Sequence, residues 1–165
     1  MSRLTVRMRP TLHVLVLFAP VIFGAHFLEE APGFVPWFNA HVARGITEGL
    51  FWRVNLTALA VTTALAMIQW ISRTSTSAGA LVTWLSFLML ANALFHIAGA
   101  VRDGAYMPGL LTAVLLYLPY YAWIVFAALR GKILSYPALV IAAAVGAAPM
   151  LLHGYLIVFR RDRLF

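Results

Sequence analysis

The sequence contains no cysteine and few charged residues. Without cysteine the chain can form no disulfide, no thiolate metal site and no cysteine nucleophile. Charged residues make up only 10% of the chain, and only five of its 165 residues are acidic. Soluble globular domains carry about 25% charged residues. The composition therefore excludes an ordinary soluble domain.

Apolar residues are abundant and fall in long runs: 63% of the chain is hydrophobic and its mean hydropathy is +0.90. A helix crossing about 30 Å of hydrocarbon needs about 20 mainly apolar residues, and an open strand cannot satisfy its backbone in lipid. Five windows have this length, at about 11–30, 50–71, 78–101, 108–129 and 136–159. We predict an all-α, polytopic membrane helical bundle of about five transmembrane helices. It forms one domain over 1–165, with an interfacial segment at about 31–49.

The net charge of +7 and the pI of about 10.6 come from twelve basic residues near the ends of these windows. At such positions Lys and Arg contact anionic head groups, so the predicted partners are membrane lipids and not nucleic acid. The two sides carry six basic residues each. The first span usually decides the topology, and Arg3, Arg7 and Arg9 before it predict a cytoplasmic N-terminus.

Three of the predicted spans contain an internal proline: Pro20, Pro119 and Pro149. Proline removes one helical hydrogen bond and frees the carbonyl four residues earlier. The sequence therefore predicts kinks in spans one, four and five.

Polar residues collect at one depth of the predicted bundle. With five spans, the ends of the odd spans and the starts of the even spans lie on the same side of the membrane. This rule places in one leaflet His26, Arg53, Asn55, Asn92, His96, Arg102, Asp103, Tyr106 and His153. A charged group at the bilayer centre costs roughly 3 kcal/mol. We therefore expect these side chains to line a shared polar site.

The spacing within this set favours metal or acid–base chemistry. His26, Glu29 and Glu30 share one helix face, and Asn92 lies one turn before His96. Imidazole and carboxylate groups are suitable ligands for zinc, iron or manganese. The candidate metal ligands are therefore His26, Glu30, His96 and His153.

The candidate catalytic residues are Glu29, Glu30 and Asn92. Glu29 would serve as a general base or would form a hydrogen bond to one of the metal ligands. Asn92 would orient His96 or hold a substrate. The pattern His-x-x-Glu-Glu differs by one residue from the zinc-binding pattern His-x-x-Glu-His. In a version without metal, Glu29 and Glu30 would share a proton and act as an acid–base pair.

A structural interpretation also fits these residues. Glu29 and Glu30 would then end the first span and pair with Arg53 or Arg102 in a network without chemistry. A single membrane histidine is also more often a hydrogen-bonding bridge between helices than a ligand. Three histidines at one depth favour the site.

Two motifs carry a resemblance to a known family. His26-Phe27-Leu28-Glu29-Glu30 and the later Asn92-Ala93-Leu94-Phe95-His96 resemble the HXXEE family of small bacterial integral membrane proteins. The stretch Tyr106-Met107-Pro108-Gly109 fits the same resemblance. It implies a bacterial inner-membrane protein and supports the choice of site residues. It implies no reaction.

We expect an intramembrane enzyme that acts on a lipid-like or isoprenoid substrate, as a hydrolase, isomerase or cyclase. Two alternatives stay open: a subunit that transports a metal ion or a proton, and a structural or accessory membrane protein. A transporter requires polar groups in the other leaflet as well, where the sequence offers few. A homo-oligomer would supply more of them.

Overall fold

A computed structural model of the chain describes residues 11–42 and 45–156. Within these residues the protein is helical, and five helical segments are long and apolar enough to cross a membrane. These spans are Leu12–Glu30, Glu48–Ser72, Ser75–Asp103, Leu110–Arg130 and Tyr136–Tyr155. The predicted all-α membrane bundle is confirmed. Span three is longer than predicted, and the predicted end of span five and Arg3, Arg7 and Arg9 lie outside the described residues.

Spans one, three and four each contain a turn that is not α-helical. Span one consists of α1 (Leu12–Leu15), the 3-10 turn η1 (Val16–Phe18) and α2 (Ala19–Glu30). Span four consists of α7 (Leu110–Thr112), the π-helical turn η3 (Ala113–Tyr117) and α8 (Leu118–Arg130). Pro20 and Pro119 lie in the first turn after these segments, where a proline lacks the N–H for a helical hydrogen bond. In span five, α9 (Tyr136–Tyr155) continues through Pro149.

Span three contains a π-helical turn without any proline. It runs through α5 (Ser75–Leu85), η2 (Ser86–Ala91) and α6 (Asn92–Asp103). One π turn adds a residue and so rotates the helix face that follows it; such turns are frequent at functional sites. Asn92 and His96 come directly after η2, so this turn determines which way their side chains face.

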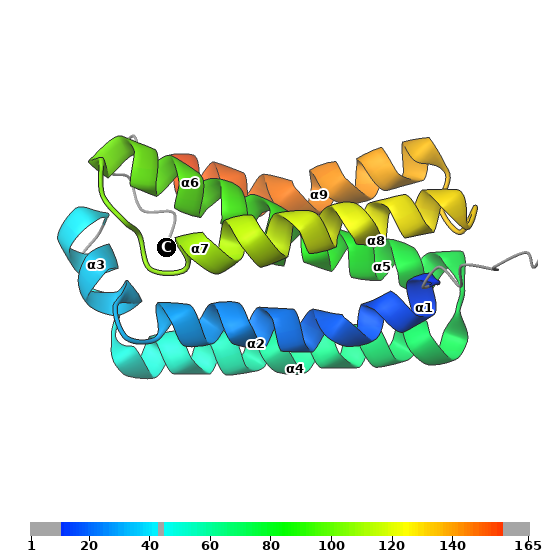
Figure 1. The fold of residues 1–165 in the computed structure, drawn as a ribbon, viewed down its shortest axis with the longest axis horizontal. Coiled ribbons are helices and arrows are strands. Elements are labelled where there is room, and N and C mark those ends of the chain that lie inside the picture. The colour runs from blue at the N-terminus through cyan, green and yellow to red at the C-terminus, as the bar shows by residue number, and fades with distance from the viewer. Residues whose placement is uncertain (1–10, 43–44, 157–165) are drawn as a thin grey trace, which may run out of the picture.

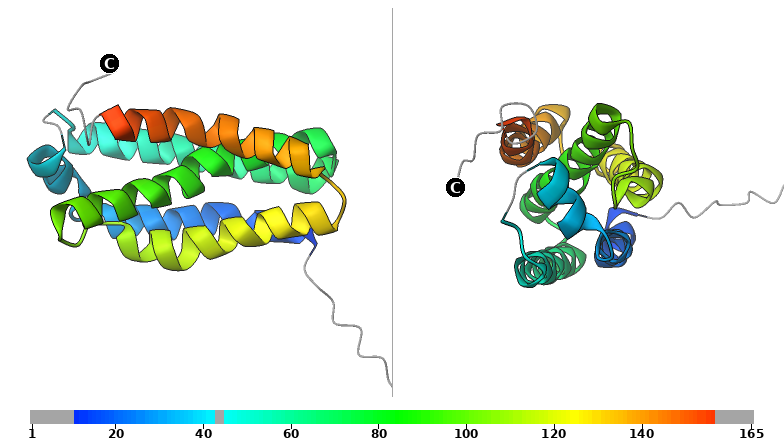
Figure 2. Two further views of the ribbon diagram at one scale, coloured as in Figure 1. Left: turned by 90° about the horizontal axis from the view of Figure 1, so that it is seen from above. Right: turned by 90° about the vertical axis from the view of Figure 1, so that its left-hand side faces the viewer.

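Span three is the central helix of the bundle. Of its apolar window, 56% is buried within the protein, against 22–39% for the other spans. Span five approaches it most closely at Gly146, where a Cβ atom would lie 2.0 Å from the Thr83 carbonyl oxygen. The alanine-rich stretch around Gly146 thus lets two helix backbones come into contact. In the view along the bundle in Figure 2, span five (orange to red) lies at the periphery of the bundle.

One end of the bundle is covered by the short helix α3 (Phe34–His41), which lies across the helix ends (Figures 1 and 2). Trp37 of α3 packs in a buried cluster with Phe95 and Met107. Gly99 permits this contact, because a Cβ there would lie 2.8 Å from the Met107 sulfur. The predicted interfacial segment is therefore a helical cover, followed by α4 (Glu48–Ser72).

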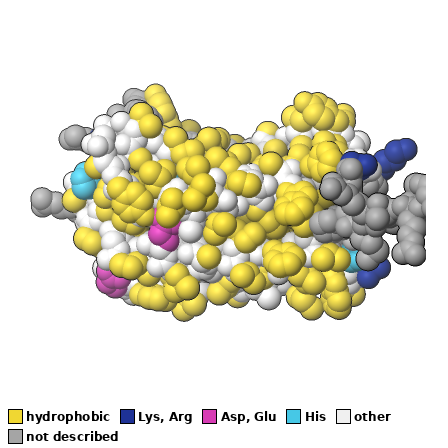
Figure 3. All heavy atoms as spheres, in the orientation of Figure 1, with side chains coloured by type: hydrophobic (Ala, Val, Ile, Leu, Met, Phe, Trp, Pro, Cys, Tyr) yellow, Lys and Arg dark blue, Asp and Glu magenta, His cyan; other side chains and the backbone are white. Residues whose placement is uncertain are grey.

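The outer surface has the polarity expected in a membrane. The face in Figure 3 is mostly hydrophobic, with acidic side chains in its left half and Lys and Arg at its right end. The described acidic residues are Glu29, Glu30, Glu48 and Asp103, and each belongs to the end of a span that adjoins α3. The two ends of the bundle therefore differ in charge.

Candidate functional site

Three ionisable side chains meet inside the bundle near α3. His26 and Glu30 lie one turn apart on α2, and His96 reaches them from α6. Their exposed fractions are 1%, 4% and 0%. One carboxylate oxygen of Glu30, Oε1, lies 3.4 Å from His26 Nε2 and 3.0 Å from His96 Nε2. The two imidazole rings stand edge to face, with centroids 4.9 Å apart.

The three side chains of this triad lie close enough together to hold a metal ion. One potential ligand atom from each residue lies within 4.8 Å of the others. Tetrahedral zinc ligands at about 2.0–2.1 Å from the ion are about 3.3 Å from one another, close to the two Nε2–Oε1 distances. Despite these distances, neither Nε2 atom is aligned with a hydrogen-bond partner among the described residues. Two of the three distances between potential ligand atoms therefore match those around a zinc ion.

The His26 ring is held from its other side by span four. Its Nδ1 lies 2.8 Å from Thr112 Oγ1, and the Thr112 hydroxyl donates to the Gly109 carbonyl at 3.3 Å. The hydrogen bond between Thr112 Oγ1 and His26 Nδ1 fixes the ring with Nε2 facing Glu30. Tyr117 packs against the same ring with centroids 4.2 Å apart.

The backbone of Gly109 closes one side of the triad. A Cβ at this position would lie 2.6 Å from His96 Cε1, 2.8 Å from Glu30 Cγ and 2.9 Å from His26 Cε1. Gly109 also has φ of 93°, which side chains other than glycine rarely adopt. Only glycine meets both requirements, so the loop before span four is shaped around the triad.

Glu29 is not part of the triad and contacts the start of span four instead. Its carboxylate accepts hydrogen bonds from the backbone N–H groups of Leu111 (3.1 Å) and Thr112 (2.8 Å), and from the Tyr106 hydroxyl. It therefore caps the N-terminus of span four, where the helix dipole favours a negative charge. None of these hydrogen bonds involves Glu30, and the acid–base pair of Glu29 and Glu30 stays a prediction.

The other predicted site residues are placed differently. Asn92 lies one turn before His96, and its buried Oδ1 has no hydrogen-bond partner among the described residues. His153 does not belong to the triad; it lines a separate cavity with Phe34 and Asn55. Neither glutamate forms an ion pair with an arginine within the described residues, so the structural network with Arg53 or Arg102 is absent there.

Two contributors to the site were not predicted from the sequence: Thr112 and Tyr117. Thr112 is a mild polar residue, and Tyr117 resembles the many aromatic residues of the chain. Both lie in the first turns of span four, at the depth of His26 and His96. That depth is the one signal in the sequence that points to them.

The comparisons with known proteins gave one match. A family model described as "Protein of unknown function with HXXEE motif" matches residues 17–124. The matched region contains the whole triad, Glu29, Asn92 and the Gly109 loop. No curated protein and no solved structure matches the chain.

The steric fit at Gly109 leads to a first prediction. Gly109→Ala should destabilise the protein by about 2–4 kcal/mol, because its methyl group overlaps three buried side chains and its φ is strained. Gly104→Ala is the matched control: Gly104 has φ of 61° and open space around its Cβ position, so only the strain of about 1 kcal/mol applies. Thermal unfolding in detergent measures both. Equal losses would contradict the close contact.

The contact between Tyr106 and Glu29 leads to a second prediction. Partial burial and the hydrogen bond to the Glu29 carboxylate raise the pKa of Tyr106 from 10.0 to about 12. The stability linked to this group is therefore complete below pH 10 and is lost as the pH rises through about 12. The difference in phenolate absorbance between the wild type and Tyr106→Phe should show this titration.

Glu29→Gln should move the Tyr106 titration back toward pH 10, because the neighbouring negative charge is gone. Glu48→Gln is the control, since Glu48 is exposed at the start of α4 and makes no contact with Tyr106. A Tyr106 titration that is the same in Glu29→Gln and Glu48→Gln would contradict the assigned contact.

Proposed function

The chain belongs to the HXXEE family, whose function is unknown, and we propose that His26, Glu30 and His96 hold one divalent metal ion in an intramembrane enzyme. The proposed substrate is lipid-like or isoprenoid. Zinc, iron and manganese are the candidate metals, since each accepts imidazole nitrogen and carboxylate oxygen.

One observation carries this proposal: three buried side chains each place one potential ligand atom within 4.8 Å of the other two. Two histidines and one carboxylate are a known ligand set of catalytic zinc, which keeps a further position open for water or substrate. A structural zinc site normally has four protein ligands instead. The count of three within the described residues favours a reactive site.

Each residue around the triad has a defined task in this proposal. A metal held there polarises a carbonyl or phosphoryl oxygen of the substrate. Thr112 holds the His26 ring so that Nε2 faces the site, and Gly109 excludes water from one side. The unpartnered Oδ1 of Asn92 is available to accept a hydrogen bond from a polar group of the substrate. The predicted role of Glu29 as a base has no support from its contacts.

A neighbouring cavity supports an apolar substrate. About 570 Å³ in volume, it lies between the start of α4 and the end of α9, and its wall is mainly apolar. Phe34 stands between this cavity and the triad, because it lines the cavity while its ring centroid lies 6.2 Å from that of His96. A hydrophobic chain in the cavity would have its polar end near the triad once Phe34 moves.

The transport alternative has less support. The buried polar residues of the other half include Thr62 and Gln69 on α4, and Ser86 of η2, which is hydrogen-bonded to the Val82 carbonyl and the Tyr121 hydroxyl. Thr62 is engaged by the Ala58 carbonyl and the Trp84 indole, and Gln69 by Ser77. These local pairs form no continuous polar path among the described residues.

Metal content tests the proposed ligand set. Purified wild type should carry about one zinc, iron or manganese ion per chain by elemental analysis. His96→Ala and Glu30→Gln should lower the metal affinity at least 100-fold, because each removes one of three ligands. His153→Ala is the matched control and should retain the metal, since His153 lies outside the triad.

Two outcomes would decide against this ligand set. If wild type neither carries nor takes up any of the three metals, the metal site is rejected and the triad is a polar contact between two spans. If His153→Ala loses the ion as completely as His96→Ala, a fourth ligand has to be added and the site is structural. Thermal unfolding of each variant separates loss of the ion from loss of the fold.

The lipid composition of membranes that contain the wild type or a variant tests the proposed enzymatic activity. Membranes from cells that express wild type should lose one lipid or isoprenoid species and gain its product, as measured by mass spectrometry. Membranes with His96→Ala should keep the species, because the reactive site lacks a ligand. Identical lipid profiles for the two proteins, at equal expression and with metal bound to wild type, would reject the enzyme.

A further inference from the structure

Span four carries three buried tyrosines close together in sequence. Tyr117 is the last residue of η3, and Tyr120 and Tyr121 follow in the first turn of α8. Their exposed fractions are 0%, 6% and 7%. A tyrosine hydroxyl can donate and accept hydrogen bonds, and it usually has a partner when it is buried. The partners of these three hydroxyls can therefore be compared directly.

Two of the three hydroxyls have partners in the protein. The Tyr120 hydroxyl donates to the Leu15 carbonyl at 2.9 Å, and the Tyr121 hydroxyl is hydrogen-bonded to Ser86 Oγ at 2.7 Å. The Tyr117 hydroxyl has no hydrogen-bond partner among the described residues, although Tyr117 is the most deeply buried of the three. A buried polar group in this state lowers the stability of the protein. We therefore looked for a function that this hydroxyl serves.

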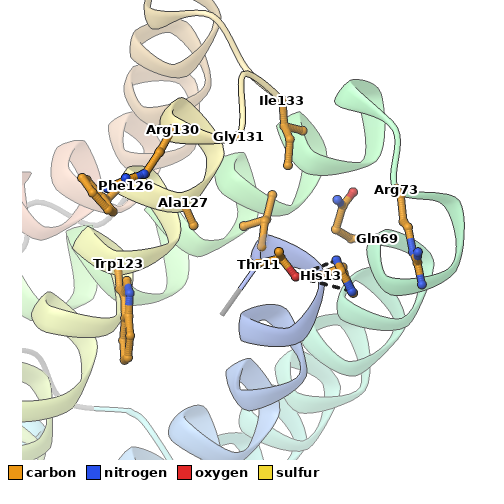
Figure 4. Close-up of a pocket in the computed structure, with 11 residues that line it drawn as sticks. Thr11, His13, Gln69, Arg73, Trp123, Phe126, Ala127, Arg130, Gly131 and Ile133 are labelled. Atoms are coloured by element: carbon orange, nitrogen blue, oxygen red, sulfur yellow. Dashed lines mark hydrogen bonds between the residues drawn. The ribbon is translucent and has the colours of Figure 1, made fainter. Parts of the chain in front are cut away.

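Tyr117 lies beside the triad. Its ring centroid is 4.2 Å from that of His26, and the Glu30 carboxylate acts electrostatically on its hydroxyl. The turn η3 packs against both α2 and α6, the helices that carry the triad. A cavity of about 590 Å³ at the other end of the bundle (Figure 4) is lined by later residues of span four, among them Trp123 and Arg130, and not by Tyr117. The Tyr117 hydroxyl therefore belongs to the surroundings of the triad.

A phenolic hydroxyl is a suitable hydrogen-bond donor at such a place. It carries no charge, so its burial next to Glu30 avoids the cost of burying a second ion. A carbonyl or phosphoryl oxygen has lone pairs enough to contact a metal ion and one hydrogen-bond donor together. A donor already in place stabilises the negative charge that develops on this oxygen. Thr112 is less suited to this task, because its hydroxyl is engaged with His26.

We propose that Tyr117 is a catalytic residue whose hydroxyl donates a hydrogen bond to the substrate oxygen that the metal polarises. This proposal rests on the proposed function and deepens it. Tyr117 keeps its proton throughout, and no bond to it forms or breaks. The proposal also narrows the substrate class: the reacting group has to contain an acceptor oxygen, as a carboxylic or phosphoric ester does. A hydrocarbon isoprenoid would leave the hydroxyl without a partner.

Thermal unfolding of the metal-free protein in detergent is the first test. Tyr117→Phe removes the hydroxyl and keeps the ring against His26, so the midpoint should rise by about 2–4 °C, because an unsatisfied buried group is lost. Tyr120→Phe and Tyr121→Phe are the matched controls. Each breaks a hydrogen bond within the protein and should lower the midpoint by about 2–4 °C. A lower midpoint for Tyr117→Phe would show that its hydroxyl has a partner in the protein and would overturn the proposal.

Conversion of the lipid in membranes, measured by mass spectrometry, is the second test. Tyr117→Phe should retain one metal ion per chain and convert the lipid about 100-fold more slowly than wild type, as the loss of one such donor predicts. Tyr121→Phe should stay within about threefold of wild type, since its hydroxyl contacts Ser86 and not the triad.

The remaining outcomes separate this proposal from the proposed function. Equal rates for Tyr117→Phe and Tyr121→Phe would reject the role of Tyr117 and leave the enzyme in place. Loss of the metal in Tyr117→Phe would also reject it, because the hydroxyl would then act on metal binding and not on the substrate. If wild type converts no lipid although its metal is bound, the enzyme itself is rejected and the role of Tyr117 with it.

Discussion

The contact of the Glu30 carboxylate with two imidazoles is the constraint on which this structure depends. A carboxylate that is 4% exposed inside a membrane bundle needs a positive or hydrogen-bonding partner, and among the described residues His26 and His96 are its ion-pair partners. Because His96 comes from span three, this contact holds the central helix against span one. The π turn η2 rotates α6 just before Asn92 and so brings His96 to face α2.

Span four depends on the same constraint. Its first turn is held by the Glu29 carboxylate, next in sequence to Glu30, and its Thr112 hydroxyl holds His26. Gly109 then lies so close to the triad that no side chain fits there. Two adjacent glutamates therefore do different work: Glu30 contacts the imidazoles, and Glu29 positions the loop that covers them.

Much of this arrangement could be predicted from the sequence. The hydropathy of the sequence predicts the five spans. Because odd-numbered spans all end on the same side of the membrane, the sequence also predicts that His26 and His96 lie at the same end of the bundle. Depth alone does not give rotation about a helix axis. Thus His153 was placed at the right depth but lines another cavity, and Glu29 at the right spacing but faces the loop. The 3-10 turn before Pro20 and the two π turns change the direction in which the side chains after them point. Span three contains no proline, so its sequence gives no sign of the π turn.

The charged groups at the two ends of the bundle find their counter-charges in different places, although both ends lie in the same membrane. A membrane offers anionic phosphates to exposed arginines, so Arg73 and Arg130 need no acidic residue in the chain. Lipid offers nothing comparable to a buried carboxylate, so the partners of Glu30 have to be encoded in the protein or brought in as a cation. This difference explains why the acidic residues and the buried histidines occupy one end together, while the basic residues at the other end have no acidic neighbours among the described residues.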